Sequence, residues 1–178
     1  IAFGNGFPVN SSAYDQSFNG NFDIAIIKLS PDGRNRIYAT YIGGNGDDQP
    51  HSLIVDPQGN LIIAGRSNST DYPQVGQKFG SGGAFDIVIT KLNATGSAII
   101  GSMKIGGSGN DGVNIADDHS NYLQSLKRNY GEDARSEVIL DSANNIYASS
   151  GAASGRASIL NAAFPTAPGA FQITLSGK

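Results

Sequence analysis

The stretch Phe22–Asp48, FDIAIIKLSPDGRNRIYATYIGGNGDD, recurs without a gap as Phe85–Asp111, FDIVITKLNATGSAIIGSMKIGGSGND. The two copies stay 63 residues apart from end to end, and the residues that recur are mainly strand hydrophobics, turn glycines, a lysine and aspartates. An internal repeat of this kind is typical of a solenoid, a propeller or another array of stacked units. The repeat therefore predicts architecture directly, whereas it contains no pattern that identifies a reaction or a ligand.

The composition predicts a folded, strand-rich chain and excludes several functional classes. Hydrophobic residues make up 39% of the 178 positions and charged residues only 15%, which is too apolar for disorder. No apolar run approaches the roughly 20 residues of a membrane helix. The 24 glycines favour many short strands joined by turns. A net charge of −3 gives no attraction for nucleic acid, and the absence of cysteine excludes disulfides, thiolate metal sites and cysteine nucleophiles.

Each copy reads as short strands joined by tight turns. Phe22–Leu29 is apolar on both faces, so we expect this strand to be covered on both sides, in a sheet stacked between two others. Arg36–Ile42 is the next predicted strand. Leu53–Val55 and Leu61–Ala64 are predicted to pair as a hairpin. Four short antiparallel strands then fill each unit of about 60 residues, which is typical of a propeller blade.

The hairpin returns later in the chain as Val138–Leu140 and Ile146–Ala148. In the turn between them Asn144 takes the place of Gly59, and asparagine is the residue other than glycine that best tolerates a left-handed backbone. An aromatic residue followed by proline marks the long loop of every copy, and we expect it to pack as a peg against the side of a sheet: Phe7-Pro8, Tyr72-Pro73 and Phe164-Pro165.

An insertion at 110–131 separates the second copy from the third. It contains the one predicted helix, Asp118–Tyr130, with Asp118 or Ser120 as its cap and an apolar stripe along one side. An insertion in one repeat lies on the rim of the array, where binding residues often gather. Both a binding role and a simple decorated loop stay open for this segment.

Several phrases carry a resemblance to a known family. TYIGGNGDDQPHSLIVDPQGNLIIAGRS and FDIVITKL resemble the SBBP-type β-propeller repeats of large bacterial surface proteins. NYGEDARSEVILDSANNIYAS is similar to the variant of gliding-motility-associated proteins. The resemblance implies an all-β fold, a β-propeller fragment of four-stranded antiparallel blades. In that family the hairpin strand at Leu53–Val55 would lie innermost and the strand at Ile99–Ile105 outermost.

The resemblance also implies a division of the chain. Residues 1–178 form a single partial propeller, with a partial blade at 1–50, a complete blade at 51–109, the insertion at 110–131 and a partial blade at 132–178. Because the chain opens on IAFGNGFP, without an initiator methionine or a basic leader, we interpret it as a piece of a longer protein. Too few blades are present to close a ring.

The turns Gly43–Asp48 and Gly106–Asp111 match GGxGxD, the core of calcium-binding nonapeptide repeats. Those calcium sites require tandem copies in adjacent turns, and here the copies lie far apart in the sequence. We therefore expect Asp48 and Asp111 to accept backbone N–H bonds and hold the turns, with no bound ion.

No other pattern predicts a catalytic, cofactor-binding or metal-binding residue. The histidines, His51 and His119, lie in neither a metal motif nor a triad spacing. Adjacent acids occur at Asp47-Asp48, Asp117-Asp118 and Glu132-Asp133, and on loops such acids are usually just solvated. Lys28 and Lys91 share one repeat position, which a strand-end lysine with its head in water explains.

Three functional classes follow from these features. The leading prediction is a non-catalytic propeller segment of a secreted or cell-surface bacterial protein, acting as a scaffold, in adhesion or in protein binding. The resemblance to gliding-associated repeats implies export by the type IX route. The alternatives are a lyase or glycosidase acting on polysaccharide, and a lectin-like module. We expect no cofactor, and we expect the open blade faces to be covered by other blades or by protein partners.

Overall fold

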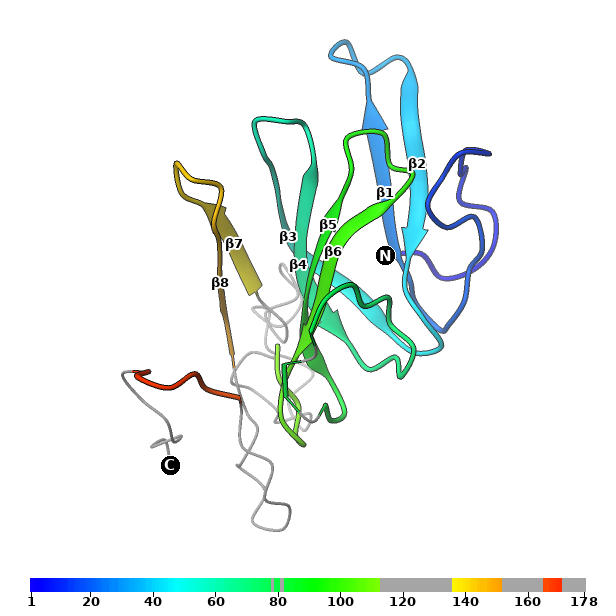
Figure 1. Ribbon diagram of the computed structural model, residues 1–178. Coiled ribbons are helices and arrows are strands. Elements are labelled where there is room, and N and C mark those ends of the chain that lie inside the picture. The colour runs from blue at the N-terminus through cyan, green and yellow to red at the C-terminus, as the bar shows by residue number, and fades with distance from the viewer. Residues whose placement is uncertain (78, 81, 113–135, 152–164, 171–178) are drawn as a thin grey trace, which may run out of the picture.

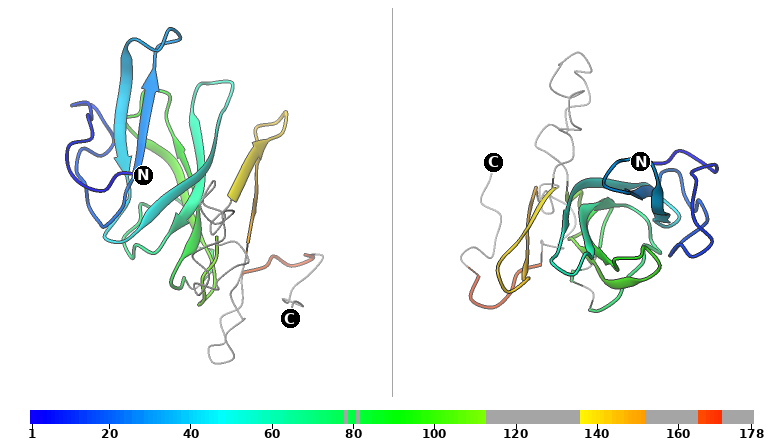
Figure 2. Two further views of the ribbon diagram at one scale, coloured as in Figure 1. Left: turned by 180° about the vertical axis from the view of Figure 1, so that it is seen from behind. Right: turned by 90° about the horizontal axis from the view of Figure 1, so that it is seen from above.

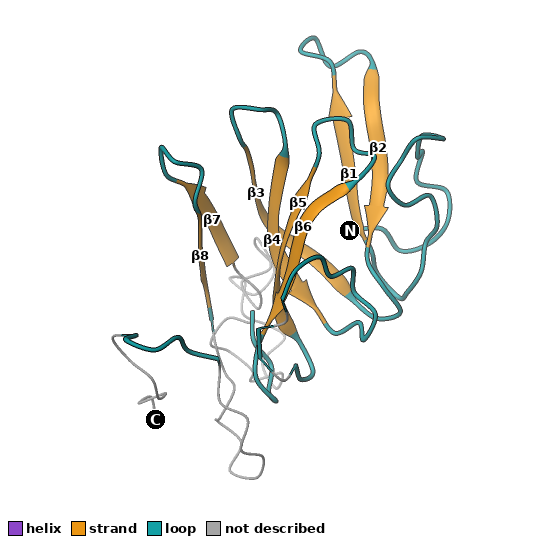
Figure 3. Ribbon diagram, viewed as in Figure 1, coloured by secondary structure: helices purple, strands orange, loops and turns teal. Residues whose placement is uncertain are grey.

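The computed structural model describes residues 1–77, 79–80, 82–112, 136–151 and 165–170, and within them every regular element is a strand (Figures 1 and 3). The strands form three antiparallel sheets: β1 (Ile24–Leu29) with β2 (Arg36–Ile42), then β3 (Asp48–Val55), β4 (Leu61–Ser67), β5 (Asp86–Leu92) and β6 (Ile99–Ile105), and last β7 (Ser136–Leu140) with β8 (Ile146–Ser150). The predicted all-β class is confirmed. No helix in these described residues could span a membrane.

The central sheet has the order β3-β4-β5-β6, with each strand beside its neighbour in sequence. This is the predicted four-stranded unit, and the two strands expected innermost and outermost, β3 and β6, are its two edges. β3 also lies beside β7 of the next sheet. Inner strands of adjacent sheets that approach one another in this way fit blades converging on one axis.

The three sheets stack face to face, with the β3–β6 sheet in the middle (Figures 1 and 2). One apolar cluster lies between the β1–β2 sheet and the middle sheet and includes Ile24, Ile26, Tyr38, Val88 and Leu92. A second cluster lies between the middle sheet and the β7–β8 sheet and joins Ile62 and Ala64 to Val138. Val88 of β5 lies in the first cluster and Ile89 packs against the second, because successive strand side chains point to opposite faces.

The expectation that Phe22–Leu29 is covered on both sides is wrong for this chain. Ile24 and Ile26 are buried against the middle sheet, but Ile27 is 47% exposed and Leu29 46% exposed on the opposite face. The reason is position in the stack: among the described residues, β1 belongs to an end sheet with a neighbour on one face only. The equivalent strand β5 lies in the middle sheet and is buried on both faces.

The hairpin turns form as their residues predict. Gly59 has φ +81° and Asn144 has φ +64°, so asparagine takes over the left-handed position in the third copy. In both turns an aspartate side chain accepts the backbone N–H two and four residues ahead, Asp56 in one and Asp141 in the other. This shared turn keeps the two hairpins equivalent although 85 residues separate their aspartates.

The start of β3 differs from its prediction, and the predicted helix falls outside the described residues. β3 begins at Asp48 instead of Leu53, because its first residues pair with the end of β4 across a bulge between Pro50 and Ser52. The helix predicted at 118–130 lies outside the described residues.

Candidate functional site

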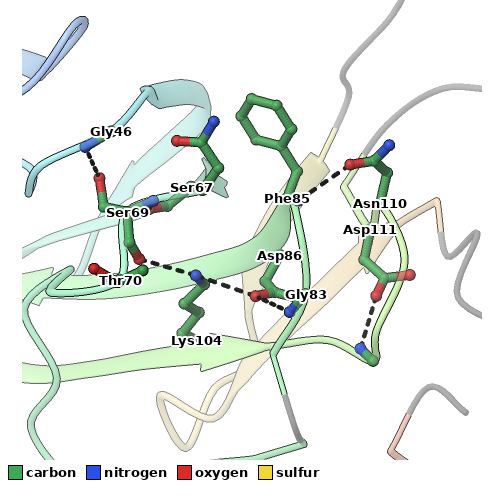
Figure 4. Close-up of polar contacts among 12 residues, drawn as sticks. Gly46, Ser67, Ser69, Thr70, Gly83, Phe85, Asp86, Lys104, Asn110 and Asp111 are labelled. Carbon is green, nitrogen blue, oxygen red and sulfur yellow. Dashed lines mark hydrogen bonds and ion pairs between the residues drawn. The ribbon is translucent and has the colours of Figure 1, made fainter. Parts of the chain in front are cut away.

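Buried polar side chains gather where one repeat passes into the next, at the two GGxGxD turns, and Figure 4 shows the contacts around Asp86 and Asp111. Asp48 Oδ2 accepts the N–H of Gly44 at 2.8 Å, and Asp111 Oδ2 accepts that of Gly107 at 2.8 Å. Both aspartates have no exposed surface. The predicted turn-holding hydrogen bonds are confirmed at both repeat positions.

A second buried carboxylate accompanies each turn, and the sequence reasoning missed it. Asp23 and Asp86 occupy one repeat position and are fully buried. The side chain of Asp86 lies so close to Gly106 that a Cβ there would collide with its Oδ1, and Gly43 meets Asp23 in the same way. The first glycine of the motif is therefore a packing requirement of the partner aspartate. The recurrence of Phe-Asp at 22–23 and 85–86 was the available signal.

The two copies of this site differ in how they balance charge. In the second copy Lys104 Nζ lies 3.1 Å from Asp86 Oδ2 and donates to the carbonyl of Ser69 at 3.0 Å (Figure 4). In the first copy the equivalent residue is Tyr41, whose hydroxyl donates to the carbonyl of Gly4. Asp23 instead accepts the backbone N–H of Asn19 at 2.9 Å. Asp86 also accepts a loop amide, the N–H of Gly83 at 3.1 Å, so the copies differ in the added lysine.

Burial dominates the titration of the first copy. Removal from water raises the pKa of Asp48, and hydrogen bonds from Ser67, Gly44 and Ser69 act in the opposite direction. Removal from water also raises the pKa of Asp23, opposed by the Asn19 N–H and reinforced by the charge of Asp48. Backbone N–H groups of the turns hold these carboxylates, while the repulsion between Asp48 and Asp23 helps to raise the pKa of Asp23.

The lysine shared by the repeats does not keep its head in water. Lys91 Nζ lies 2.7 Å from Oδ2 of Asp56, whose side chain has no exposed surface. The hydrogen bond from Lys91 lowers the pKa of Asp56 well below its usual range, with further help from Asn60. The sequence prediction failed because the partner lies on another turn, 35 residues away. Lys28, at the same repeat position, donates to the carbonyl of Ala94 at 3.3 Å.

The structure brings together one histidine and a serine that sequence spacing did not connect. His51 Nδ1 lies 3.2 Å from Ser136 Oγ, which in turn lies 2.8 Å from Ser150 Oγ. Burial lowers the pKa of His51 to about 4, and the charge of Arg66 adds to this. Ser136 is almost fully buried. This contact joins β3 to β7.

The aromatic-proline peg is confirmed at Tyr72. Its ring belongs to the cluster between the first two sheets, and its hydroxyl lies 2.8 Å from Thr90 Oγ1. Removal from water raises the pKa of Tyr72 far above its usual value. Phe7 packs its ring 5.5 Å from that of Tyr41. Phe164 lies outside the described residues.

The remaining candidates stay untested or isolated. His119, Asp117-Asp118 and Glu132-Asp133 lie outside the described residues. Asp47 accepts a 3.3 Å hydrogen bond from the side chain of Asn68. In the part of the chain that the structure describes, no three histidine, aspartate or glutamate side chains gather as a metal site would require.

One comparison with known proteins bears on this arrangement. Residues 37–73 match the sequence model of a family described as SBBP, Beta-propeller repeat. The matched stretch runs from β2 through the Gly43–Asp48 turn and the β3–β4 hairpin to the Tyr72 peg. No curated protein matches the chain.

Proposed function

We propose that this chain, which carries an SBBP β-propeller repeat at residues 37–73, is a non-catalytic segment of a secreted or cell-surface bacterial protein with a scaffold, adhesion or protein-binding role. The observation that carries the proposal is the use of the recurring polar residues. Asp48, Asp56, Asp86 and Asp111 hydrogen-bond to turns or to a neighbouring lysine. The polar residues that recur between the repeats are therefore those that hold the turns between stacked sheets.

The same observation weighs against the alternatives. A lectin-like module with one site per blade should repeat exposed polar and aromatic residues at its loops, whereas here the recurring residues are buried or hold turns. An enzyme should bring acids or a histidine to an open cleft. His51 and Ser136 do meet, but they do so inside a sheet interface.

We further propose that the parent protein is exported, by the type IX route, to the surface of a gliding bacterium. The support is the likeness of NYGEDARSEVILDSANNIYAS, near 129–149, to the repeats of gliding-associated proteins. Exposed apolar faces at both ends of the stack support a role in which other blades or protein partners cover them, and Ile27 and Ile139 are examples.

Surface labelling of intact cells tests this proposal. Antibody against residues 1–178 should label unpermeabilised cells that make the parent protein, and external protease should remove the signal. Deletion of the segment from the parent gene should impair surface attachment or movement without loss of polysaccharide degradation. Labelling only after permeabilisation would contradict the location. Loss of polysaccharide cleavage on deletion, or sugar binding by the purified chain, would favour the enzyme or the lectin.

A further inference from the structure

We propose that Asp23 and Asp48 form a proton-binding pair, which tightens the first junction between repeats, at the Gly43–Asp48 turn, as the solution becomes acidic. The second junction has the equivalent residues Asp86 and Asp111 and lacks this response, because it carries a lysine. The inference concerns the fold of this chain and does not depend on the cellular role proposed above. Three observations carry it: two buried carboxylates against one glycine, a buried oxygen without a donor, and the loss of the lysine from one repeat.

The two carboxylates lie against the same glycine. Asp48 Oδ2 lies 2.8 Å from the position that a Cβ on Gly43 would take, and Asp23 Oδ1 lies even closer to that position. Both side chains are fully buried. Two ionised carboxylates this near to one another repel, and burial removes the water that would screen them. A single proton on such a pair relieves both costs, as it does in other paired carboxylates.

The first junction has too few hydrogen-bond donors for its carboxylate oxygens. Asp23 Oδ2 accepts the Asn19 N–H at 2.9 Å, while Asp23 Oδ1 is buried without a hydrogen-bond partner among the described residues. On Asp48 a single oxygen, Oδ2, accepts both the Gly44 N–H and the Ser69 hydroxyl. A buried acceptor that meets no donor is costly, and a protonated carboxyl carries a donor of its own. A proton on Asp23 Oδ1 would therefore supply the donor that this junction lacks.

The second junction balances its charge with a cation. Lys104 Nζ lies 3.1 Å from Asp86 Oδ2. Tyr41 occupies the repeat position of Lys104, and its hydroxyl donates its one hydrogen to the Gly4 carbonyl at 3.1 Å. Tyr41 therefore brings neither a positive charge nor a donor to Asp23. Oδ1 of Asp86 also has no hydrogen-bond partner among the described residues, so the lysine is what distinguishes the two junctions.

The groups around the pair favour uptake of a proton. Burial raises the pKa of Asp23, and the charges of Asp48 and Asp15 raise it further, against the hydrogen bond of a loop amide. Burial also raises the pKa of Asp48, although Lys104 acts in the opposite direction. Tyr72 lies close enough for the charge of Asp48 to act on it, and burial raises the pKa of Tyr72 far above its usual value. Among the described residues no lysine or arginine forms an ion pair with either carboxylate.

Acid should favour the closed form of the first junction. In an open or unfolded chain an aspartate titrates near about 3.9. Because the closed pair keeps its proton to a higher pH, it binds more protons than the open form once the pH exceeds that value. Closure is therefore weakened as the pH rises through the pKa of the closed pair. The contact between Lys104 and Asp86 needs an ionised carboxylate, so acid cannot strengthen the second junction in this way.

Hydrogen exchange in the full-length parent protein tests the pair at single amides. The Asn19 N–H binds Asp23 and the Gly83 N–H binds Asp86, so the two amides report on equivalent positions. As the pH falls from about 7 to about 5, the protection factor of Asn19 should rise several-fold, within the limit of about tenfold per pH unit that one proton sets. The protection factor of Gly83 should not rise. The same pH dependence at both amides, or no rise at Asn19, would overturn the proposal.

Asp23→Asn separates the proton from the hydrogen bonding of the turn. Asparagine keeps an oxygen for the Asn19 N–H but cannot take up a proton, so the pH dependence should also disappear at Gly44, whose N–H binds Asp48. The matched control is Asp86→Asn, which should leave the pH dependence at Gly44 in place. A pH dependence at Gly44 that survives unchanged in Asp23→Asn would contradict the proposal.

The infrared band of a protonated carboxyl gives a readout that does not depend on exchange. The unsubstituted parent protein should gain this band between about pH 7 and about pH 5, above the range in which an ordinary aspartate takes up its proton. The gain should be smaller in Asp23→Asn and unchanged in Asp86→Asn. A gain of equal size in both variants, or no gain in the unsubstituted protein, would overturn the proposal.

Discussion

Buried aspartates form the main polar contacts at each junction between repeats. A buried aspartate is costly unless it accepts hydrogen bonds or meets a cation. Asp111 meets this condition with the Gly107 N–H, and Asp86 with Lys104. The GGxGxD motif, which resembles a calcium-binding turn, here holds the turn that leads the chain from one sheet to the next.

Substitution of Asp111 distinguishes a turn-holding role of this side chain from calcium binding. Asp111→Ala should destabilise the protein by about 1–3 kcal/mol, because the buried Gly107 N–H loses its acceptor. Calorimetry should detect no stoichiometric calcium binding by the unsubstituted protein. The control Asp32→Ala, in an exposed turn, should leave stability nearly unchanged. Stoichiometric calcium binding that disappears in Asp111→Ala would refute the turn-holding role.

The pair of Asp56 and Lys91 predicts a dependence of stability on pH. The pKa of Asp56 is lowered in the folded state, whereas an unfolded aspartate titrates near about 3.9. The stability that this group contributes is therefore fully present above the unfolded pKa and is lost as the pH falls toward the folded pKa. At pH 7 Asp56→Asn should melt at a lower temperature than the unsubstituted protein. The difference between the two melting temperatures should shrink below about pH 4.

Thermal melts from pH 7 to pH 3 at one protein concentration provide the measurement. Lys91→Met removes the cation that lowers the pKa of Asp56. The melting temperature of this variant should therefore approach that of the unsubstituted protein over the same acidic range. A difference in melting temperature that stays constant from pH 7 to pH 3 would show that the ion pair does not set this pH dependence.

At the level of elements, β2 and β6 end where a glycine allows close approach. β2 and β6 both run into a Gly-Gly step, and the first glycine of each step packs against a buried aspartate of the neighbouring strand. The long loop that follows β4 is then fixed by Tyr72, whose hydroxyl reaches Thr90. The loops of this chain are positioned by the same residues that order its sheets.

Glycine-to-alanine substitutions separate packing from simple strand propensity. Gly106→Ala would place a methyl group against Asp86 Oδ1, so we expect a loss of about 1–3 kcal/mol, typical of overpacking. Gly101, also at the β6 edge, has no atom within 4 Å of an added Cβ. Gly101→Ala should therefore be neutral or slightly stabilising. Equal losses from the two variants in urea unfolding would contradict the close packing of the junction.

The sequence predicts the strands and turns well because their signals are local. The apolar runs and their recurrence after 63 residues locate β2, β5 and β6, and the Asn144 turn follows from the likeness of Asn144 to Gly59. It does not predict contacts between elements distant in the chain. The partner of Lys91 is Asp56 on the turn of another hairpin, and His51 meets Ser136 only because β3 and β7 adjoin. Exposure of Ile27 depends on the place of β1 in the stack, which a repeat pattern alone does not give.

At the scale of the whole molecule, stability depends on what lies against each sheet. Among the described residues the middle sheet has an apolar neighbour on both faces, while the end sheets have one each. Ile27, Leu29 and Ile139 remain exposed in consequence. Burying one such side chain contributes about 1.5–3 kcal/mol, so several left bare compare with the whole stability of a domain, about 5–15 kcal/mol. The chain should therefore be ordered fully only when its ends are covered.

Molar mass and amide dispersion of residues 1–178, recorded together over a dilution series, test this claim most directly. We expect dispersed amide signals while the chain is associated or bound to a partner, and loss of dispersion as it dilutes to a monomer. A dilute monomer with full amide dispersion and cooperative unfolding would contradict the claim that this stack of sheets needs neighbours at its ends.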